Sequence, residues 1–495
     1  MMIVGYFILL VYLISLVFVT IFCLMQLHLL YRYYSKRLSR GTKFNFDHEV
    51  GNTEIPFVTI QLPIFNEKYV VERLIDNIMQ IDYPKDRYEV QILDDSTDDT
   101  LDITKSKVAH YQSLGYNVAC LARTDRSGFK AGALKAATAF AKGDFIAIFD
   151  ADFLPKPDFL KTTMSSFDDP KIGVVQTRWE HLNQHYSLLT EMQAFQLNVH
   201  FTIEQKGRYE AGYMLQFNGT AGVWRKTCID DAGGWEADTL TEDLDLSYRA
   251  QLKGWKIKYL EDVTAPAELP AEINGLKSQQ FRWMKGGAET AKKMLPKVWA
   301  SNIAWTKKVQ ATVHLLSSSV FIFVFLLGVF SVPLLFFINP LGIKPESFTI
   351  FLVSLLSIIM VYFAANVGKA WPRENVVKMV LKFLLLFPIF LALSMGLAFH
   401  NSLAVLQGWI GKQSAFVRTP KYGTKGKSTS ISKKSYFSQK MDWVAVGEGL
   451  LCLYFLGAIY LANAYDMPEF IAMHVLLALG YLILFGYAIK SKFAQ

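Results

Sequence analysis

Cysteine is scarce in this chain, which has only four in 495 residues: Cys23, Cys120, Cys228 and Cys452. No two of them form a Cys-x-x-Cys pair, so the sequence predicts neither a disulfide framework nor a zinc site. Charged residues are also few, at 19%, whereas hydrophobic residues make up 52%. This composition excludes a purely soluble enzyme, and we expect part of the chain to lie in a membrane.

The chain also lacks a strong imbalance of charge, because its formal net charge is only +8. The basic residues gather beside the apolar runs, where contact with lipid headgroups and membrane topology accounts for them. A nucleic-acid-binding protein is therefore disfavoured. We expect the lipid bilayer, and no nucleic acid, among the partners.

The first apolar run, Val4–Leu30, has no charged residue and is long enough to span a membrane. No small-residue cleavage pattern separates it from the basic stretch Arg32–Lys43, so we expect a retained anchor over residues 1–31. The positive-inside rule then places the N-terminus outside and the following domain in the cytoplasm.

Between residues 45 and 300 short apolar strands alternate with amphipathic helices, which predicts a mostly parallel α/β sheet. The predicted strands are Val58–Leu62, Glu89–Leu93, Asn117–Leu121, Phe145–Phe149 and Gly173–Gln176, and the predicted helices are Lys68–Gln80, Asp98–Ser113 and Ala131–Ala141. Ligands of such sheets bind beyond the carboxyl ends of the strands. Polar residues follow the strands there, at Asn66-Glu67, Asp94-Asp95 and Asp150–Asp152.

The strand Phe145–Phe149 ends in the triplet Asp150-Ala151-Asp152. Because side chains alternate along an extended chain, both carboxylates point to the same side. Two hard oxygen donors in one place suit Mg²⁺ or Mn²⁺, which keep positions open for phosphate oxygens. An acidic turn without a metal is the alternative for an isolated triplet.

Two further features are compatible with a nucleotide. Asp94-Asp95 offers a carboxylate to a base or ribose, beyond what helix capping by Ser96 or Asp98 explains. Lys130 stands just before a predicted helix start, a place suited to phosphate, although a solvated lysine explains it equally well.

Two more motifs point to transfer chemistry. Thr241-Glu242-Asp243 opens a predicted helix, and beside a nucleotide site Asp243 is a candidate general base; a helix cap by Thr241 is the alternative. Gln279, Arg282 and Trp283 share one helical face. Their amide, guanidinium and indole suit a pyrophosphate beside a sugar ring, and a helix resting on the membrane is the alternative.

In this order and between membrane segments, these motifs resemble the D, DxD, TED and QxxRW set of the family 2 processive glycosyltransferases, the cellulose synthase superfamily. The resemblance extends to Phe217–Gly222 and to Phe416–Lys421, which is similar to the family's gating loop, although Arg418 stands where the family has valine. Residues 93–98, 129–134 and 200–205 are most similar to the cellulose-synthase-like A mannan and glucomannan synthases and their bacterial relatives.

The resemblance implies a Rossmann-like GT-A fold and a nucleotide-diphosphate sugar whose anomeric centre is inverted. It implies that Asp150 and Asp152 hold the metal and diphosphate and that Asp243 deprotonates the acceptor. The other implied donor-binding residues are Asp94, Asp95, Lys130, Gln279, Arg282, Thr419 and Lys421, and the implied acceptor-binding residues are Glu242, Gly219, Thr220 and Trp283.

Apolar runs of spanning length return at Val313–Ile338, Phe348–Ala365, Met379–Ala404, Val444–Ala464 and Phe470–Ile489. The basic loop Lys412–Lys440 and the basic C-terminal tail should both be cytoplasmic, which requires an even number of crossings. One run should therefore not cross. We expect this run to be Met379–Ala404, which Pro388 and Gly396 interrupt, lying in the membrane plane or re-entering.

These expectations divide the chain into an anchor (1–31), a GT-A domain with interfacial helices at its C-terminal end (45–300), transmembrane or in-plane helices (310–408), a cytoplasmic gating-like loop (409–442) and a C-terminal transmembrane hairpin (443–495). We expect a multi-pass membrane protein with a cytoplasmic catalytic domain. The membrane would be the plasma or inner membrane in a bacterium and the Golgi if the protein is plant-like.

The expected function is an inverting membrane glycosyltransferase that uses a UDP-glucose or GDP-mannose type of donor. It would extend a β-linked polysaccharide, with coupled translocation as an option. A single transfer to a lipid acceptor, giving a glycolipid, is the alternative. A membrane scaffold or transporter with a degenerate enzyme-like domain is a third interpretation, which the presence of every motif acid disfavours.

Overall fold

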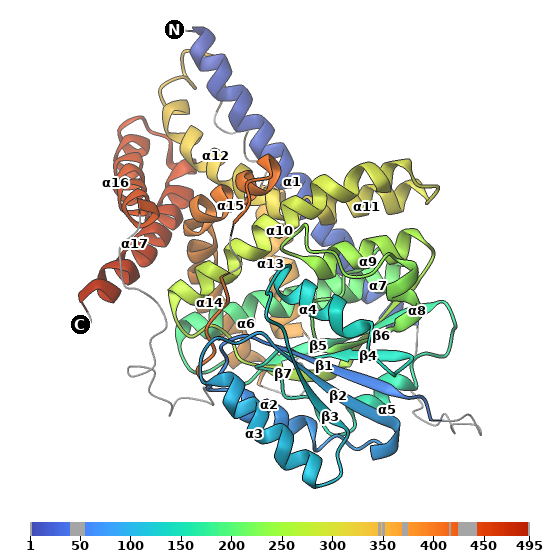
Figure 1. Cartoon of the computed structure of the whole chain (residues 1–495). Helices are drawn as coiled ribbons and strands as arrows, with labels where there is room; N and C mark the ends of the chain where they lie inside the picture. The colour runs from blue at the N-terminus through green and yellow to red at the C-terminus, as the bar shows by residue number, and fades with distance from the viewer. Residues whose placement is uncertain are drawn as a thin grey trace.

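The computed structural model describes residues 2–39, 55–344, 348, 352–368, 375–414, 417–423 and 443–493. An α/β domain forms one half of the molecule, and long helices from both ends of the chain form the other (Figure 1). The first helix, α1 (Met2–Ser39), has its N-terminal end farthest from the sheet. Most of the predicted loop 409–442, including Phe416, lies outside the described residues.

Seven strands form one sheet in the order β3-β2-β1-β4-β6-β5-β7. They are β1 (Val58–Ile64), β2 (Tyr88–Asp94), β3 (Val118–Ala122), β4 (Phe145–Ile148), β5 (Ile172–His181), β6 (Gly222–Arg225) and β7 (Lys256–Ala267). β6 runs antiparallel to β4 and β5, and the other pairs are parallel, which confirms the predicted sheet. The sequence does not predict β6, which has four residues, or β7, which mixes charged with apolar residues.

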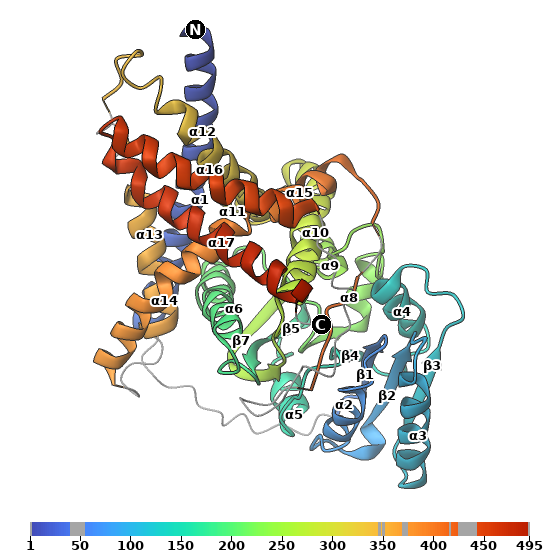
Figure 2. The same ribbon diagram turned by 90° about the vertical axis from the view of Figure 1, so that its left-hand side faces the viewer.

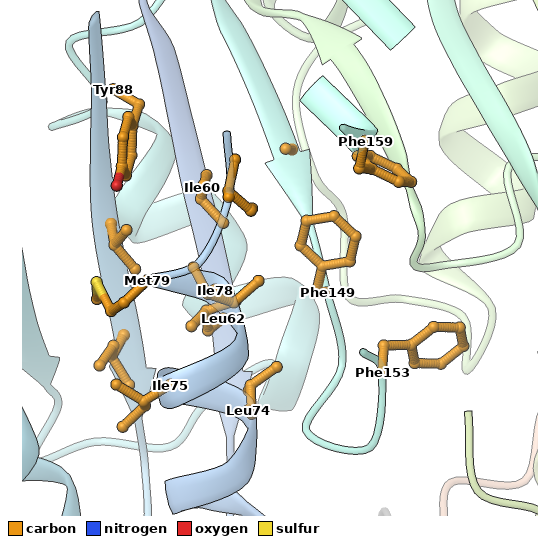
Figure 3. Close-up of a cluster of buried hydrophobic side chains, with 14 of the residues drawn as sticks. Ile60, Leu62, Leu74, Ile75, Ile78, Met79, Tyr88, Phe149, Phe153 and Phe159 are labelled. Atoms are coloured by element: carbon orange, nitrogen blue, oxygen red, sulfur yellow. The ribbon is translucent and has the colours of Figure 1, made fainter. Parts of the chain in front are cut away.

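Hydrophobic clusters cover both faces of this sheet. On one face, Leu74, Ile75 and Ile78 of α2 (Val71–Ile78) lie against Ile60 and Leu62 of β1 (Figure 3). All five side chains are fully buried. Burying each such side chain contributes roughly 1.5–3 kcal/mol, so this layer fixes the strands whose ends carry the polar residues.

The remaining helices of the α/β domain are α3 (Thr100–Ser113), α4 (Phe129–Thr138), α5 (Phe159–Met164), α6 (Leu188–Val199), α7 (Lys206–Ala211), α8 (Lys226–Asp231) and α9 (Glu242–Leu252). The expectation that Lys130 precedes a helix is wrong, because Lys130 is the second residue of α4. Gly128, with a φ of +72°, allows the chain to turn into the helix earlier than predicted. A π-helical turn, His200–Gln205, joins α6 to α7.

Two helices follow the sheet and connect it to the apolar half of the molecule. α10 (Ile273–Ala300) carries the predicted Gln279, Arg282 and Trp283. It is followed by α11 (Trp305–Leu315). Thr241 occupies the N-cap position of α9, but the alternative interpretation of its side chain as a helix cap is wrong: the side chain makes no capping hydrogen bond, and its hydroxyl lies 3.0 Å from that of Thr290 on α10.

Within the described residues, five helices are long and apolar enough to cross a membrane: Met2–Ser35, Ser317–Leu334, Val376–Gly396, Trp443–Ala464 and Pro468–Lys490. A shorter apolar helix covers Leu352–Gly368. These elements are labelled α1, α12 (Val320–Leu334), α13 (Leu352–Phe363), α14 (Val376–Gly396), α16 (Trp443–Ala464) and α17 (Ile471–Phe493). The amount and placement of apolar helix support a membrane-associated protein.

The predicted non-crossing run Met379–Ala404 forms two helices, α14 and α15 (Ala398–Ile410). The expected break at Pro388 is wrong, because α14 continues through this proline and ends at Gly396. By length and composition α14 is itself a candidate span. In Figure 2 α14 lies beside α6 of the α/β domain, and α15 lies beside α10.

Candidate active site

A cavity of about 200 Å³ lies beyond the carboxyl ends of β1, β2 and β4. Residues from distant parts of the chain line it, including most of the predicted site residues: Asp95, Lys130, Asp150, Asp152, Gly219, Glu242, Asp243, Gln279, Arg282, Trp283, Thr419 and Lys421. Asp94 and Thr220 are placed directly behind this wall, with 1% and 0% of their surfaces exposed. The sequence motifs therefore meet in space.

The two aspartates at the carboxyl end of β2 have different surroundings. Asp94 accepts a hydrogen bond from the Ser96 backbone N–H at 2.9 Å. Asp95 faces the cavity and is held by Arg123, whose Nε donates to Asp95 Oδ1 at 3.0 Å. Beside it the Arg126 guanidinium stacks 3.2 Å from the centre of the Phe65 ring. This flat, cationic surface was not predicted, because Phe65 and Arg126 belong to no motif.

Asp150 is bound on two sides. Its Oδ1 lies 2.5 Å from Lys130 Nζ, and its backbone N–H donates to Thr220 Oγ1 at 2.9 Å. Lys130 also donates to the Gly219 carbonyl at 2.9 Å. Burial acts to lower the pKa of Lys130, but the charges of Asp150, Glu242 and Asp243 outweigh it, so the pKa is raised and the ammonium stays charged.

Asp152 lies deeper and contacts the segment 417–423. Its Oδ2 accepts from Lys421 Nζ at 2.7 Å and from the Glu268 backbone N–H at 3.1 Å. Asp150 and Asp152 thus present carboxylate oxygens to one cavity, each already neutralised by a lysine ammonium. This donor set fits a hard divalent cation such as Mg²⁺ or Mn²⁺.

A second group of acids, Glu236, Asp238 and Asp245, also brings oxygen atoms within 4.8 Å of one another. Lys293 Nζ lies among them, 2.5 Å from Glu236 Oε2, 2.8 Å from Asp238 and 3.0 Å from Asp245 Oδ1. Unlike Asp150 and Asp152, these three acids do not line the cavity, and one ammonium contacts all three of them, so we assign the cluster to the packing of α9 against α10.

Asp243 lies in the first turn of α9, where its Oδ1 accepts from the Leu244 N–H at 2.8 Å. Burial and the neighbouring Glu242 raise the pKa of Asp243 to about 7, against the opposing charge of Lys130. Gly219 adopts a φ of +78°, and a Cβ there would lie 3.0 Å from Asp243 Oδ2. A side chain at position 219 would therefore crowd the carboxylate. A carboxyl with this pKa is suited to accept a proton near neutral pH.

The face of α10 that carries Gln279, Arg282 and Trp283 lines the cavity opposite the aspartates. Arg282 Nη2 donates to Thr419 Oγ1 at 2.7 Å, which joins α10 to the segment 417–423. The positive charge of Arg282 faces Asp150 and Glu242 across the cavity. The arrangement can hold an anionic ligand between Arg282 and the two lysines.

Arg418, the departure from the family pattern, forms an ion pair with Glu67, its Nη1 lying 3.0 Å from Glu67 Oε2. Burial raises the pKa of Glu67 to about 8, against the lowering effects of Arg418 and Lys421. The sequence places Glu67 at a strand end but gives it no role. Trp179, His181 and Asn218 also line the cavity without having been predicted.

A second cavity of about 430 Å³ adjoins the first. Trp179, Leu197, Asn218, Asp243 and Trp283 line both cavities. Most of the rest of its wall comes from α1, α6, the π-helical turn, α10, α11, α12, α13 and α14. The second cavity therefore extends from Asp243 into the apolar half of the molecule.

Comparison with protein families matches residues 56–286 to the family described as "Glycosyltransferase like family 2". Glucomannan 4-beta-mannosyltransferase 9 of Arabidopsis thaliana is 41% identical over 269 residues, which cover 53% of this chain and 50% of that protein. Glucomannan 4-beta-mannosyltransferase 1 of Oryza sativa subsp. japonica is 41% identical over 257 residues, covering 51% and 49%. The chain thus spans about half the length of these curated relatives.

Among solved structures, a mannosyltransferase from Pyrobaculum calidifontis in complex with GDP-Man and Mn²⁺ superimposes with a TM-score of 0.52 at 20% identity. The match covers 74% of this chain and 100% of that one. At this identity the likeness concerns the fold alone. It confirms the GT-A type of α/β fold predicted from the sequence.

Proposed function

Because residues 56–286 of this chain are a glycosyltransferase family 2 domain, we propose that the protein transfers a hexose from a nucleotide-diphosphate sugar to the end of a growing β-linked polysaccharide. One observation carries this proposal. The acids, lysines and guanidinium expected around a donor line one cavity, which meets a second, larger cavity at Asp243. The donor and the acceptor saccharide thereby occupy separate cavities, which join at the proposed base, Asp243.

Asp243 acts as the general base that removes the proton from the attacking acceptor hydroxyl. Gln279 and Arg282 hold the diphosphate, and the charge of Arg282 stabilises the negative charge that develops as the sugar leaves. Trp283 lines both cavities and stacks on the terminal sugar of the acceptor. Glu242, Gly219 and Thr220 shape the acceptor side of the site.

Asp150 and Asp152 would hold a divalent cation, Mn²⁺ or Mg²⁺, in the donor cavity. When bound, such an ion offsets charge on the leaving group. Lys130 and Lys421 contact the same carboxylates and bring further positive charge to the diphosphate. Thr419 contacts Arg282 and completes the donor side.

GDP-mannose is the donor we propose first, and UDP-glucose is its competitor. The support is that the similar plant proteins are named glucomannan 4-β-mannosyltransferases. The solved mannosyltransferase of similar fold carries GDP-Man. Asp94 and Asp95 contact the base or ribose, with the Phe65–Arg126 stack beside them.

The segment α14–α15 does not cross the membrane in this proposal. Near its start, Lys382 forms an ion pair with Glu191 of α6, and Met379 and Phe383 pack in the cluster that contains Leu189 of α6. Near its end, α15 packs along α10. Both ends thus touch the catalytic half. The segment 417–423 and the catalytic domain then share the cytoplasmic side of a multi-pass protein.

A screen of nucleotide sugars with linkage analysis of the product tests the proposal. We expect purified protein to incorporate label from GDP-mannose or UDP-glucose into a β-linked product. A single organic-extractable labelled species would instead identify a glycolipid synthase. Failure to hydrolyse or transfer from every nucleotide sugar would favour a non-enzymatic membrane protein.

A further inference from the structure

One stretch of the second cavity's wall is polar, although the apolar helices surround most of it. The residues of this stretch come from α1, the π-helical turn, the loop before β6 and α11: Gln26, His200, Glu204, Gln216, Asn218 and His314. The catalytic roles above use none of these six residues.

These side chains form a continuous hydrogen-bonded chain. Gln26 Nε2 donates to Glu204 Oε1 at 2.6 Å. The His200 ring spans the next gap, with Nδ1 2.9 Å from Glu204 Oε2 and Nε2 2.9 Å from Asn218 Oδ1. The two ring nitrogens of His200 therefore join Glu204 to Asn218.

The charge balance of the chain supports this arrangement. Burial acts to raise the pKa of Glu204, but the His200 hydrogen bond and the charge of Arg208 lower it to about 2. Glu204 is therefore an anion beside Arg208. Hydrogen bonds to this anion hold Gln26 and His200 in fixed orientations, and His200 in turn contacts Asn218.

Asn218 is oriented by two donors. Its Oδ1 accepts from Gln216 Nε2 at 2.9 Å as well as from His200. Its Nδ2 is then left as a donor. The residue is only 8% exposed, and this atom is buried without a hydrogen-bond partner among the described residues. Buried amide groups are normally hydrogen-bonded, so such an atom in a cavity wall points to a ligand.

Gln26 shows the complementary pattern. It is 4% exposed, and its Oε1 is buried without a hydrogen-bond partner in the same described part of the chain. Gly207 explains why α1 comes close enough to reach Glu204: a Cβ at this position would lie 2.6 Å from the Leu29 carbonyl oxygen. Helix α1 is thus part of the cavity wall.

We propose that Asn218 Nδ2 and Gln26 Oε1 are a hydrogen-bond donor and acceptor for successive sugar hydroxyls of the acceptor saccharide, held in position by His200 and Glu204. This inference rests on the proposed function. Sugar hydroxyls both donate and accept hydrogen bonds, so a saccharide satisfies both atoms, whereas a lipid chain would leave both unpaired. Asn218 lines both cavities and acts next to the reacting end; Gln26 lines only the second and acts farther along.

The test measures KM for a disaccharide and for a longer β-linked oligosaccharide, with the full chain in detergent and a radiolabelled nucleotide sugar. Asn218→Asp keeps Oδ1 and removes the Nδ2 donor, and we expect KM for both acceptors to rise about five- to tenfold. Gln26→Leu should raise KM only for the longer acceptor. The Kd of the nucleotide sugar should change less than about twofold in both variants.

The positioning role of His200 has its own readout. His200→Leu should raise the acceptor KM as Asn218→Asp does, and His200→Gln, which retains a donor, should restore part of it. Combining His200→Leu with Asn218→Asp should not raise the acceptor KM above that of Asn218→Asp alone, because the two residues act through one contact. Gln91→Leu is the matched control: it removes a buried amide of β2, which β1 and β4 separate from β6, and should lower Tm without moving the acceptor KM.

An unchanged acceptor KM in Asn218→Asp, while the wild type transfers sugar, would overturn this inference and leave the proposed function standing. If the wild type transferred no sugar from any nucleotide donor, the proposed function would fall and this inference with it. Asn218→Ser provides the same measurement if Asn218→Asp does not fold.

Discussion

Asp243 is half-buried and lies beside Glu242, Lys130 and the backbone of Gly219. Asparagine at this position keeps the shape and hydrogen bonding of the side chain and removes only its capacity to take a proton. We expect Asp243→Asn to keep the Kd of the nucleotide sugar within a few-fold of wild type and to lower kcat by about 10² to 10⁴. A comparable loss of nucleotide affinity would assign Asp243 to donor binding.

The pH dependence of the rate follows from the same carboxyl. Its pKa is raised to about 7, so at lower pH it carries a proton and cannot accept one from the acceptor hydroxyl. The value of kcat/KM should therefore increase as the pH rises through about 7 and level off above it. A rate profile that is flat from about pH 6 to about pH 8 would contradict this assignment.

Substitution of Asp152 tests the proposed metal site. Asp152→Ala should abolish turnover and weaken binding of the nucleotide sugar, and an excess of chelator should have the same effect on the wild type. Asp238→Ala is the control, because Asp238 belongs to the cluster around Lys293. That variant should retain its dependence on divalent metal. Full wild-type activity in excess chelator would rule the metal out.

Among single residues, the sequence predicts the acids and the α10 residues well, because charged groups at strand ends need a partner or a ligand. It assigns no role to Glu67, Asn218 or the Phe65–Arg126 stack. Their importance comes from contacts between distant segments, such as Glu67 with Arg418, and such contacts leave no local pattern in a sequence.

The contact between α10 and the start of α9 sets the position of Asp243 relative to the proposed diphosphate-binding residues of α10. A Cβ on Gly286 would lie 2.6 Å from Thr241 Cγ2 and 2.9 Å from the Leu240 carbonyl carbon. Gly286→Ala should therefore push α10 away from Thr241 and lower kcat about 10- to 100-fold, because small displacements of reacting groups are costly.

Gly275→Ala, on the same helix, is the matched control, since the nearest atom to its Cβ is Pro270 Cβ at 3.5 Å, an ordinary contact. Measuring kcat together with Tm separates the two effects. An undiminished kcat in Gly286→Ala would show that the spacing of α9 and α10 tolerates this change.

Among the elements, alternating apolar strands and amphipathic helices are predictable because each follows a short period. Helix boundaries depend on single residues and are predicted less well. Gly128 starts α4 early, and α14 continues through Pro388, because a proline costs less where neighbouring helices surround the backbone.

The membrane topology is a property of the whole molecule. If α14–α15 does not cross, Gln413 faces the same side as the catalytic domain. A single cysteine at Gln413, with the four native cysteines replaced, should resist an impermeant thiol reagent in intact cells and react after permeabilisation. Reaction in intact cells would place the segment outside and remove Thr419 and Lys421 from the donor site.

The division into a membrane half and an α/β half is predictable because it depends on composition and hydropathy alone. The sequence presents the first helix only as an anchor. Its contribution of Phe22, Cys23 and Gln26 to the second cavity depends on packing against a segment about 178 positions away. Long-range packing of this kind is beyond sequence periodicity.

The central claim is that the two joined cavities serve one transfer reaction that extends a saccharide. The most direct measurement is the length of the product that purified full-length protein makes from radiolabelled GDP-mannose or UDP-glucose with a divalent metal. We expect labelled β-linked chains of many sugars that stay at the chromatographic origin and disappear in Asp243→Asn. Label found only in free monosaccharide, or equal product from Asp243→Asn, would contradict the account.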